Sequence, residues 1–154
     1  MKIVLFQPQI PQNVGNIVRT CKATGASLVL VRPLGFSTSS RHLKRAGLDY
    51  WDGVNFEEID DLEKYIEECN VPFFFLSSKV SKPYVNARFT KDCLLIFGSE
   101  TSGLPAQLFE TWKDNFYTIP MKREARCLNL SNSAAIVLYE ALRKTQFLLL
   151  NSAE

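Results

Sequence analysis

Short apolar runs, separated by polar or amphipathic stretches, form the main pattern along this chain. The runs are KIVLFQ (2–7), SLVLVRP (27–33), PFFFLSS (72–78), CLLIFG (93–98) and NFYTIP (115–120). Their apolar residues are consecutive and do not alternate with polar ones, so strands formed from them should be buried on both faces. The pattern predicts strands of a sheet that is covered by helices on both sides.

Helical patterns occupy the first half of the intervening sequence. Asn13 is expected to cap a helix that runs to about Thr24, and a short basic helix is expected near SSRHLKRAG (39–47). In the next helical pattern, DDLEKYIEEC, Asp60 and Glu63 have the spacing of a capping box. Helices therefore lie between successive strands.

The second half adds two further helices. PAQLFETW (105–112) predicts a short helix with proline in its first turn. The last helix is expected to begin near Leu130 and to run at least to Lys144. Alternating strands and helices predict an α/β fold with a mostly parallel sheet flanked by helices. In such sheets, ligands bind beyond the carboxyl ends of the strands.

The last helix is apolar around most of its circumference between Ala134 and Leu142. A helix of this kind must be buried on more than one side. In a chain of 154 residues, a subunit interface is a candidate for the second covered surface.

The composition fits one globular domain spanning residues 1–154, because 46% of the residues are hydrophobic and 22% are charged. The sequence has no bilayer-length apolar run and no signal-peptide cleavage region, so a cytoplasmic protein without a membrane partner is expected. Four scattered cysteines and the single histidine, His42, form no zinc pattern, and no metal is expected. The cysteines should be reduced core residues, with a catalytic Cys–His pair as the less favoured alternative.

Charge is unevenly distributed although the net charge is only +2. Seven basic residues and no acidic residue precede Asp49, whereas the stretch from Asp49 to Glu68 contains nine acids and only Lys64 as a base. A basic first third suits a polyanionic partner such as RNA. The same charges could also balance in three dimensions, and charge alone favours neither interpretation.

Three polar stretches carry the candidate chemistry. PQNVGNIVRT (11–20) puts Arg19 in the second turn of its helix, although alone it is also typical of a capped helix with a surface arginine. IFGSETSGLP (96–105) ends a strand with Gly98 and Gly103 nearby, which would allow an unusual backbone angle and the close approach of a ligand. It contains neither a Walker loop nor GxGxxG, so an ordinary strand-to-helix turn is the alternative.

The third stretch, IPMKREARCLNLSNSAA (119–135), leads from a strand end through a charged loop into an apolar helix. Ser131, Asn132 and Ser133 could cap that helix. They could equally hold a substrate or fix another loop, and the sequence leaves both roles open.

Together, in this order and spacing, the three stretches resemble the three motifs of the SPOUT-superfamily RNA 2′-O-methyltransferases. GFSTSSRHLKRAGLDYW (35–51) is similar to a segment of the smallest members, which modify the wobble nucleotide of tRNA. The resemblance extends from about Lys2 to Phe147. It implies a C-terminal deep trefoil knot, a homodimer and methyl transfer from S-adenosyl-L-methionine to the ribose 2′-hydroxyl of a wobble cytidine or modified uridine.

The resemblance also implies roles for particular residues. The cofactor would be held, largely by main-chain groups, at Leu76, Gly98, Ile119, Cys127 and Leu128. The catalytic set would be Arg19, Glu100, Ser131 and Asn132. Because a guanidinium group is normally only a donor, we expect Arg19 to orient the ribose or phosphate and to stabilise developing negative charge. Glu100 is expected to have a structural role, and the polar pair of the third motif should organise the site.

The implied RNA partner is the anticodon stem-loop of tRNA, recognised through 2′-hydroxyls, backbone shape and unstacked bases. The candidates for phosphate contacts are Arg41, Arg45, Lys79 and Arg126, with solvated surface residues as the alternative. Tyr139, in the last helix, either approaches a partner's site or packs in the core.

Three other functions remain open. The chain could methylate another ribose of tRNA or rRNA, or it could be a non-catalytic RNA-binding dimer. A hydrolase that uses Cys127 or a serine together with His42 is the least favoured, because no G-x-S-x-G motif is present.

Overall fold

The structure is a computed structural model that describes residues 1–37 and 53–150. Its centre is a sheet with strand order β3-β2-β1-β5-β4-β6, in which every neighbouring pair is parallel. The strands are β1 (Lys2–Phe6), β2 (Ser27–Val31), β3 (Phe56–Ile59), β4 (Phe73–Leu76), β5 (Leu94–Phe97) and β6 (Phe116–Tyr117). Because the strands are parallel, all of their carboxyl ends meet at one edge of the sheet.

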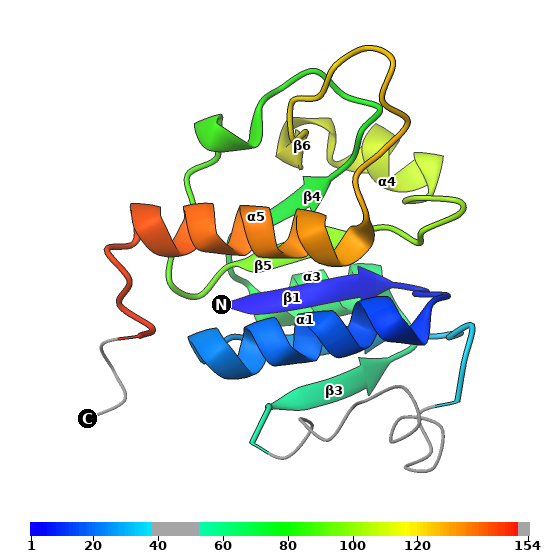
Figure 1. Ribbon diagram of the computed structural model, residues 1–154. Coiled ribbons are helices and arrows are strands. Elements are labelled where there is room, and N and C mark those ends of the chain that lie inside the picture. Colours follow the sequence, from blue (N-terminus) through cyan, green and yellow to red (C-terminus); the bar gives the residue numbers. More distant parts are fainter. Residues whose placement is uncertain (38–52, 151–154) are drawn as a thin grey trace.

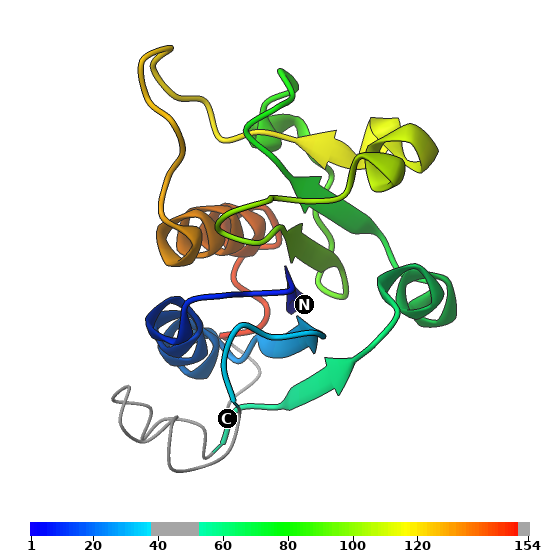
Figure 2. The same cartoon turned by 90° about the vertical axis from the view of Figure 1, so that its right-hand side faces the viewer.

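Helices cover both faces of this sheet. They are α1 (Pro11–Thr24), α3 (Leu62–Cys69), α4 (Ala106–Thr111) and α5 (Leu130–Lys144), with short 3-10 turns η1 (Tyr84–Asn86) and η2 (Lys113–Asn115). Figure 1 shows α1 and α5 next to each other across one face, and Figure 2 shows α3 and α4 on the opposite side of the strands. The predicted α/β class with a covered parallel sheet is confirmed.

Each face has its own hydrophobic core. In β1, Ile3 and Leu5 pack toward α1 and α5, whereas Val4, between them, packs toward α3 and α4. All three side chains are fully buried. A buried strand of this sheet therefore needs consecutive apolar residues, because alternate side chains enter two different cores.

All five predicted strands are present, and the predicted bounds of α5 are correct. The strand β3 was not predicted. It lies at the edge of the sheet, pairs only with β2 and has a partly exposed sequence, FEEI. An edge strand of this kind needs no continuous apolar run, so the pattern that identified the other strands does not apply to it.

Two predicted helix starts were wrong. Ile10 is the N-cap of α1 and Pro11 begins the helix, so Asn13 lies inside the first turn. Asn13 is buried, and its side chain bonds to other loops instead of capping its own helix. In α3, the N-cap is Asp61, whose carboxylate accepts a hydrogen bond from Lys64 N at 3.0 Å. The residue before it, Asp60, instead forms an ion pair.

The caps of the other two helices also differ from expectation. Pro105 is the N-cap of α4, with an extended ψ of 140°, and does not lie in the first turn. Asn129 is the N-cap of α5, and Ser131, Asn132 and Ser133 lie within the helix. The basic helix that we expected near residues 39–47 lies outside the described residues.

The acidic stretch neutralises part of the basic first third. Lys2 Nζ lies 2.9 Å from Glu57 Oε1, and Arg32 Nη2 lies 2.7 Å from Asp60 Oδ2. The positive charges of these two residues are therefore balanced by carboxylates within the protein. Arg41, Lys44 and Arg45 lie outside the described residues.

The cysteines occupy different environments. Burial raises the pKa of the Cys21 thiol to about 12 and also raises the pKa of Cys93. Both are core residues, as expected. Cys69 is only partly buried and Cys127 is exposed, so the prediction of a core position is wrong for Cys127.

None of the helices within residues 1–37 and 53–150 combines the length and the apolar character that crossing a membrane requires.

The end of α5 holds the long segment between β4 and β5. The Lys144 ammonium donates hydrogen bonds to the carbonyls of Val85 and Ala87 and lies 5.7 Å from the centre of the Phe89 ring. This segment is also bonded to the end of β6, because Tyr84 N donates to Thr118 O at 2.8 Å. Lys144 thereby connects α5 to the loop that passes beside the last strand.

We expect Lys144→Met to lower the free energy of unfolding by about 1–3 kcal/mol, because two carbonyls lose a charged donor. Arg143→Met is the matched control. Arg143 is the neighbouring cation on the same helix end. Its own side chain is 63% exposed, and its partner Glu140 also lies 4.0 Å from Lys144, so its removal should change stability less. Urea denaturation measures both, and equal effects of the two substitutions would contradict the role of Lys144.

Candidate active site

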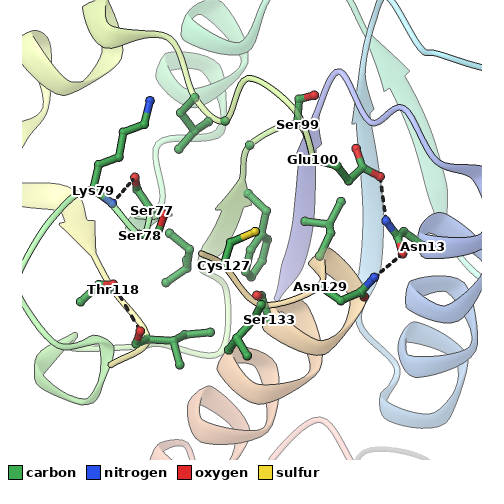
Figure 3. A pocket seen from close by; sticks show the side chains of 18 of the residues that line it. Asn13, Ser77, Ser78, Lys79, Ser99, Glu100, Thr118, Cys127, Asn129 and Ser133 are labelled. Carbon is green, nitrogen blue, oxygen red and sulfur yellow. Dashed lines mark hydrogen bonds between the residues drawn. The ribbon is translucent and has the colours of Figure 1, made fainter. Parts of the chain in front are cut away.

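A cavity of about 260 Å³ opens at the carboxyl ends of β4, β5 and β6 (Figure 3). Its walls come from the loops that follow these strands, namely residues 77–79, 98–100, 118–119 and 121. Residues 127–130, which lead into α5, and Ile10 and Asn13, at the start of α1, also line it. The cavity thus lies at the edge of the sheet where α/β proteins bind ligands.

Gly98 allows the second of these loops to fold back on itself. A β-carbon at this position would lie 2.3 Å from Gly103 C and 2.5 Å from Leu104 N. Ser99 and Gly103 close the loop through two backbone hydrogen bonds, of 2.9 and 3.2 Å. An unusual backbone angle was expected at both glycines of this loop; Gly103 has a positive φ of 70°, whereas Gly98 is not among the glycines with positive φ. Gly98 is needed because its own loop packs against it.

The carboxylate of Glu100 binds this loop to the start of α1. It accepts hydrogen bonds from Gln9 N at 2.8 Å, from Ile10 N at 3.1 Å and from Asn13 Nδ2 at 2.9 Å. A negative charge is favoured at a helix N-terminus, where backbone N–H groups lack intrahelical partners. Glu100 therefore fixes where α1 begins relative to the cavity.

Asn13 extends the same network to the third motif. Its Oδ1 accepts a hydrogen bond of 2.9 Å from Asn129 Nδ2, across 116 positions of sequence. Asn129 Oδ1 in turn accepts from Ser131 N at 2.9 Å and from Ser131 Oγ at 2.6 Å. Figure 3 shows Glu100, Asn13 and Asn129 joined in one line of hydrogen bonds. All three motifs are thus connected.

Sequence reasoning assigned no role to Asn129. The signal that could have identified it is its place immediately before the first residue of α5, because asparagine is a preferred N-cap. A second function for this cap is visible only when α1 and α5 are seen next to each other.

Most of the residues that the sequence assigned to the site are brought together. All five expected cofactor residues line the cavity, as do Glu100 and Lys79. Ser131 is buried behind the wall, where it bonds to Asn129. Three residues lie at the surface outside the cavity lining: Arg19, Arg126 and Asn132. Arg41, Arg45 and His42 lie outside the described residues.

The cavity walls consist of apolar side chains, hydroxyl groups and backbone groups. Leu76, Phe97 and Ile119 supply apolar surface, and Ser77 and Thr118 add hydroxyl groups. The backbone N–H and C=O groups of residues 127 and 128 make no hydrogen bond with another described residue. In the part of the chain that the structure describes, no group of three His, Cys, Asp or Glu side chains could hold a metal ion. These walls suit a flat organic ligand with polar edges.

The volume is close to the lower end of the range of about 300–1,000 Å³ that is typical for small-molecule sites. The exposed positions of Cys127 and Leu128 leave one side of the cavity open. A ligand bound here would remain accessible to a second substrate from that side.

Similarity to known proteins agrees with this arrangement. The model of the SpoU rRNA Methylase family matches residues 1–139. A candidate tRNA (cytidine(34)-2′-O)-methyltransferase of Geobacillus stearothermophilus is 46% identical over 151 residues, which are 96% of each chain. The tRNA (cytidine(34)-2′-O)-methyltransferase of Methylovorus glucosotrophus is 42% identical over 147 residues and covers 94% of this chain and 96% of its own.

Solved structures show the same fold. A candidate RNA methyltransferase from Bacillus anthracis has a TM-score of 0.89 and 46% identity, covering 96% of this chain and 95% of its own. A structure solved to explain the 2-OH methylation of C/U34 on tRNA has a TM-score of 0.84 and 40% identity. The match covers 93% of this chain and 94% of that one. An AdoMet-bound rRNA methyltransferase from Sinorhizobium meliloti has a TM-score of 0.78 and 26% identity, with coverages of 92% and 55%.

We expect Asn129→Ala to destabilise the protein by about 1–3 kcal/mol, because it removes the cap of α5 and leaves Asn13 Oδ1 without its donor. Asn132→Ala is the matched control. Asn132 lies three residues later at the surface, and its side chain makes no hydrogen bond with another described residue. Thermal and urea unfolding compare the two variants. A loss of stability in Asn132→Ala as large as that in Asn129→Ala would contradict the network.

Proposed function

Because this chain belongs to the SpoU rRNA Methylase family, we propose that it methylates the ribose 2′-hydroxyl of the wobble nucleotide of tRNA, using S-adenosyl-L-methionine. One observation carries the proposal: every residue that the motifs assign to the cofactor lines one cavity at the carboxyl edge of the sheet. The relatives that are named for this reaction match nearly the whole chain.

The cavity fits the cofactor in its chemical character. Adenine suits the apolar surface of Leu76 and Ile119, and polar groups of the cofactor can bond to the backbone of residues 127 and 128. The cofactor would supply a methyl group that is already activated by its bond to a positively charged sulfur. The protein's main task is then to bind and align the two substrates.

The hydrogen bonds from Glu100 through Asn13 to Asn129 would set the shape of this cavity. Ser131 would contribute through Asn129, to which its hydroxyl donates. Arg19 would orient the ribose or its phosphate and stabilise the charge that develops on the 2′-oxygen. It lies at the surface of α1 and outside the cavity lining, six residues and about 9 Å along the helix axis from Asn13. We therefore propose that it acts on the pocket of a second copy of the chain.

The second copy would belong to a homodimer formed through α5. Tyr139 is 48% exposed and Ile136 is 37% exposed on this helix, so the core position considered for Tyr139 is wrong. The residues between them, Val137 and Leu138, are fully buried. Two exposed apolar side chains one turn apart on a helix that lies beside α1 suit a subunit interface.

The remaining features belong to the same proposal. Residues 1–154 would form one cytoplasmic methyltransferase domain with a C-terminal trefoil knot, to which the three loops around the cavity would contribute. Asn132 would help to organise the site, and Lys79 and Arg126, together with Arg41 and Arg45, would contact phosphates of the anticodon stem-loop. Lys79 and Arg126 support this role by their exposed positions on the loops around the cavity.

A transfer assay tests the proposal. The protein is incubated with methyl-labelled S-adenosyl-L-methionine and total tRNA from cells that lack the activity, and the labelled nucleosides are mapped by mass spectrometry. We expect a single 2′-O-methylated pyrimidine at the wobble position. Label at another ribose would change the substrate, and tRNA binding without any transfer would favour the non-catalytic dimer.

We expect Arg19→Ala to lower kcat by about 10²–10³-fold, because a donor aimed at the developing negative charge is lost. The affinity for S-adenosylhomocysteine should not change, since Arg19 lies outside the cavity lining. Lys22→Ala removes a cation one turn further along α1 and serves as the control. Full turnover in Arg19→Ala would remove this residue from the mechanism.

A further inference from the structure

A charged turn stands at the rim of the cavity. Residues 121 and 127 both line the cavity, and the chain between them leaves the rim and returns. Its turn is closed by a hydrogen bond of 3.0 Å from Ala125 N to Lys122 O. In Figure 1 this segment is the orange loop that rises from β6 and descends to the start of α5. The turn therefore lies directly beside the open side of the cavity.

The turn carries positive charge that the described chain does not neutralise. Lys122, Arg123 and Arg126 are exposed, and with Glu124 as the only acid the segment has a net charge of +2. The three cationic side chains form no ion pair or hydrogen bond with another described residue. Elsewhere, Lys2 and four further cations pair with carboxylates; these are Arg32, Lys64, Arg143 and Lys144.

The loop that follows β4 carries two lysines, of which only one is bonded to other described residues. The Lys79 ammonium, on the cavity wall, has no partner among the described residues. Lys82, three residues later, donates to Asp114 O at 2.8 Å and lies 4.2 Å from the centre of the Tyr117 ring. Lys82 thus holds the loop in place, whereas the cations of the turn are available to a ligand.

We propose that Lys122 and Arg123 bind backbone phosphates of the single-stranded RNA next to the ribose that is methylated. The inference rests on the proposed function, which puts a polyanionic substrate at the open side of the cavity. Arginine and lysine on a hydrogen-bonded turn can contact successive phosphates without reading bases. The turn therefore contributes affinity and aligns the RNA strand, whereas contacts to the bases determine which tRNA is selected.

The test is the salt dependence of tRNA binding by the full-length protein. The variant Lys122→Ala/Arg123→Ala is compared with Lys91→Ala/Lys113→Ala, which also removes two exposed cations. Lys91 precedes β5 and Lys113 precedes β6, so both lie at the amino edge of the sheet, opposite the cavity. Filter binding gives the dissociation constant of tRNA at several salt concentrations, and calorimetry gives the affinity for S-adenosylhomocysteine.

We expect the slope of log Kd against log salt concentration to fall by about 1.4 in the turn variant, or about 0.7 for each lost phosphate contact. The control slope should match that of the wild type, and all three proteins should bind S-adenosylhomocysteine equally. An unchanged slope in the turn variant, or an equal change in both variants, would overturn the inference while leaving the proposed function intact. A wild-type protein that binds no tRNA would overturn both.

Discussion

The carboxylate of Glu100 is the contact on which the rest of the site depends. It accepts two backbone N–H groups and one side-chain amide at the start of α1, and through Asn13 it is linked to Asn129. Asn13, in the middle of this network, is buried, so losing one of its partners leaves a buried amide group unpaired at a cost of about 1–3 kcal/mol. One side chain thus joins three loops that are far apart in the sequence.

The sheet determines where this network can form. Parallel strands bring the ends of β4, β5 and β6 to one edge, and Gly98 lets the loop after β5 close on itself without a side chain in the way. The cavity walls are then built from backbone, hydroxyl and apolar groups, and selectivity for a ligand must come from the shape of the loops. The start of α5 contributes Asn129 to the network, and its far end holds the segment between β4 and β5 through Lys144.

The apolar runs predicted β1, β2, β4, β5 and β6 because each of these buried strands faces two cores. They could not predict β3, whose exposed edge position needs no such run. The caps of α1 and α5 were misplaced because Asn13 and Asn129 bond to one another across the site, and no local pattern contains that contact. The motifs correctly grouped the residues that line the cavity. They could not reveal that Arg19 lies outside its lining, since that depends on how α1 is oriented against the sheet.

The central claim is that one line of hydrogen bonds sets the shape of the cofactor cavity. A double-mutant cycle with Glu100→Gln and Asn129→Ala, read out as affinity for S-adenosylhomocysteine by calorimetry, tests it most directly. Both residues bond to Asn13, which lies between them. We predict a coupling free energy of about 1 kcal/mol or more. Effects that add to within about 0.3–0.5 kcal/mol would contradict the claim, because the two residues would then act on the cavity independently.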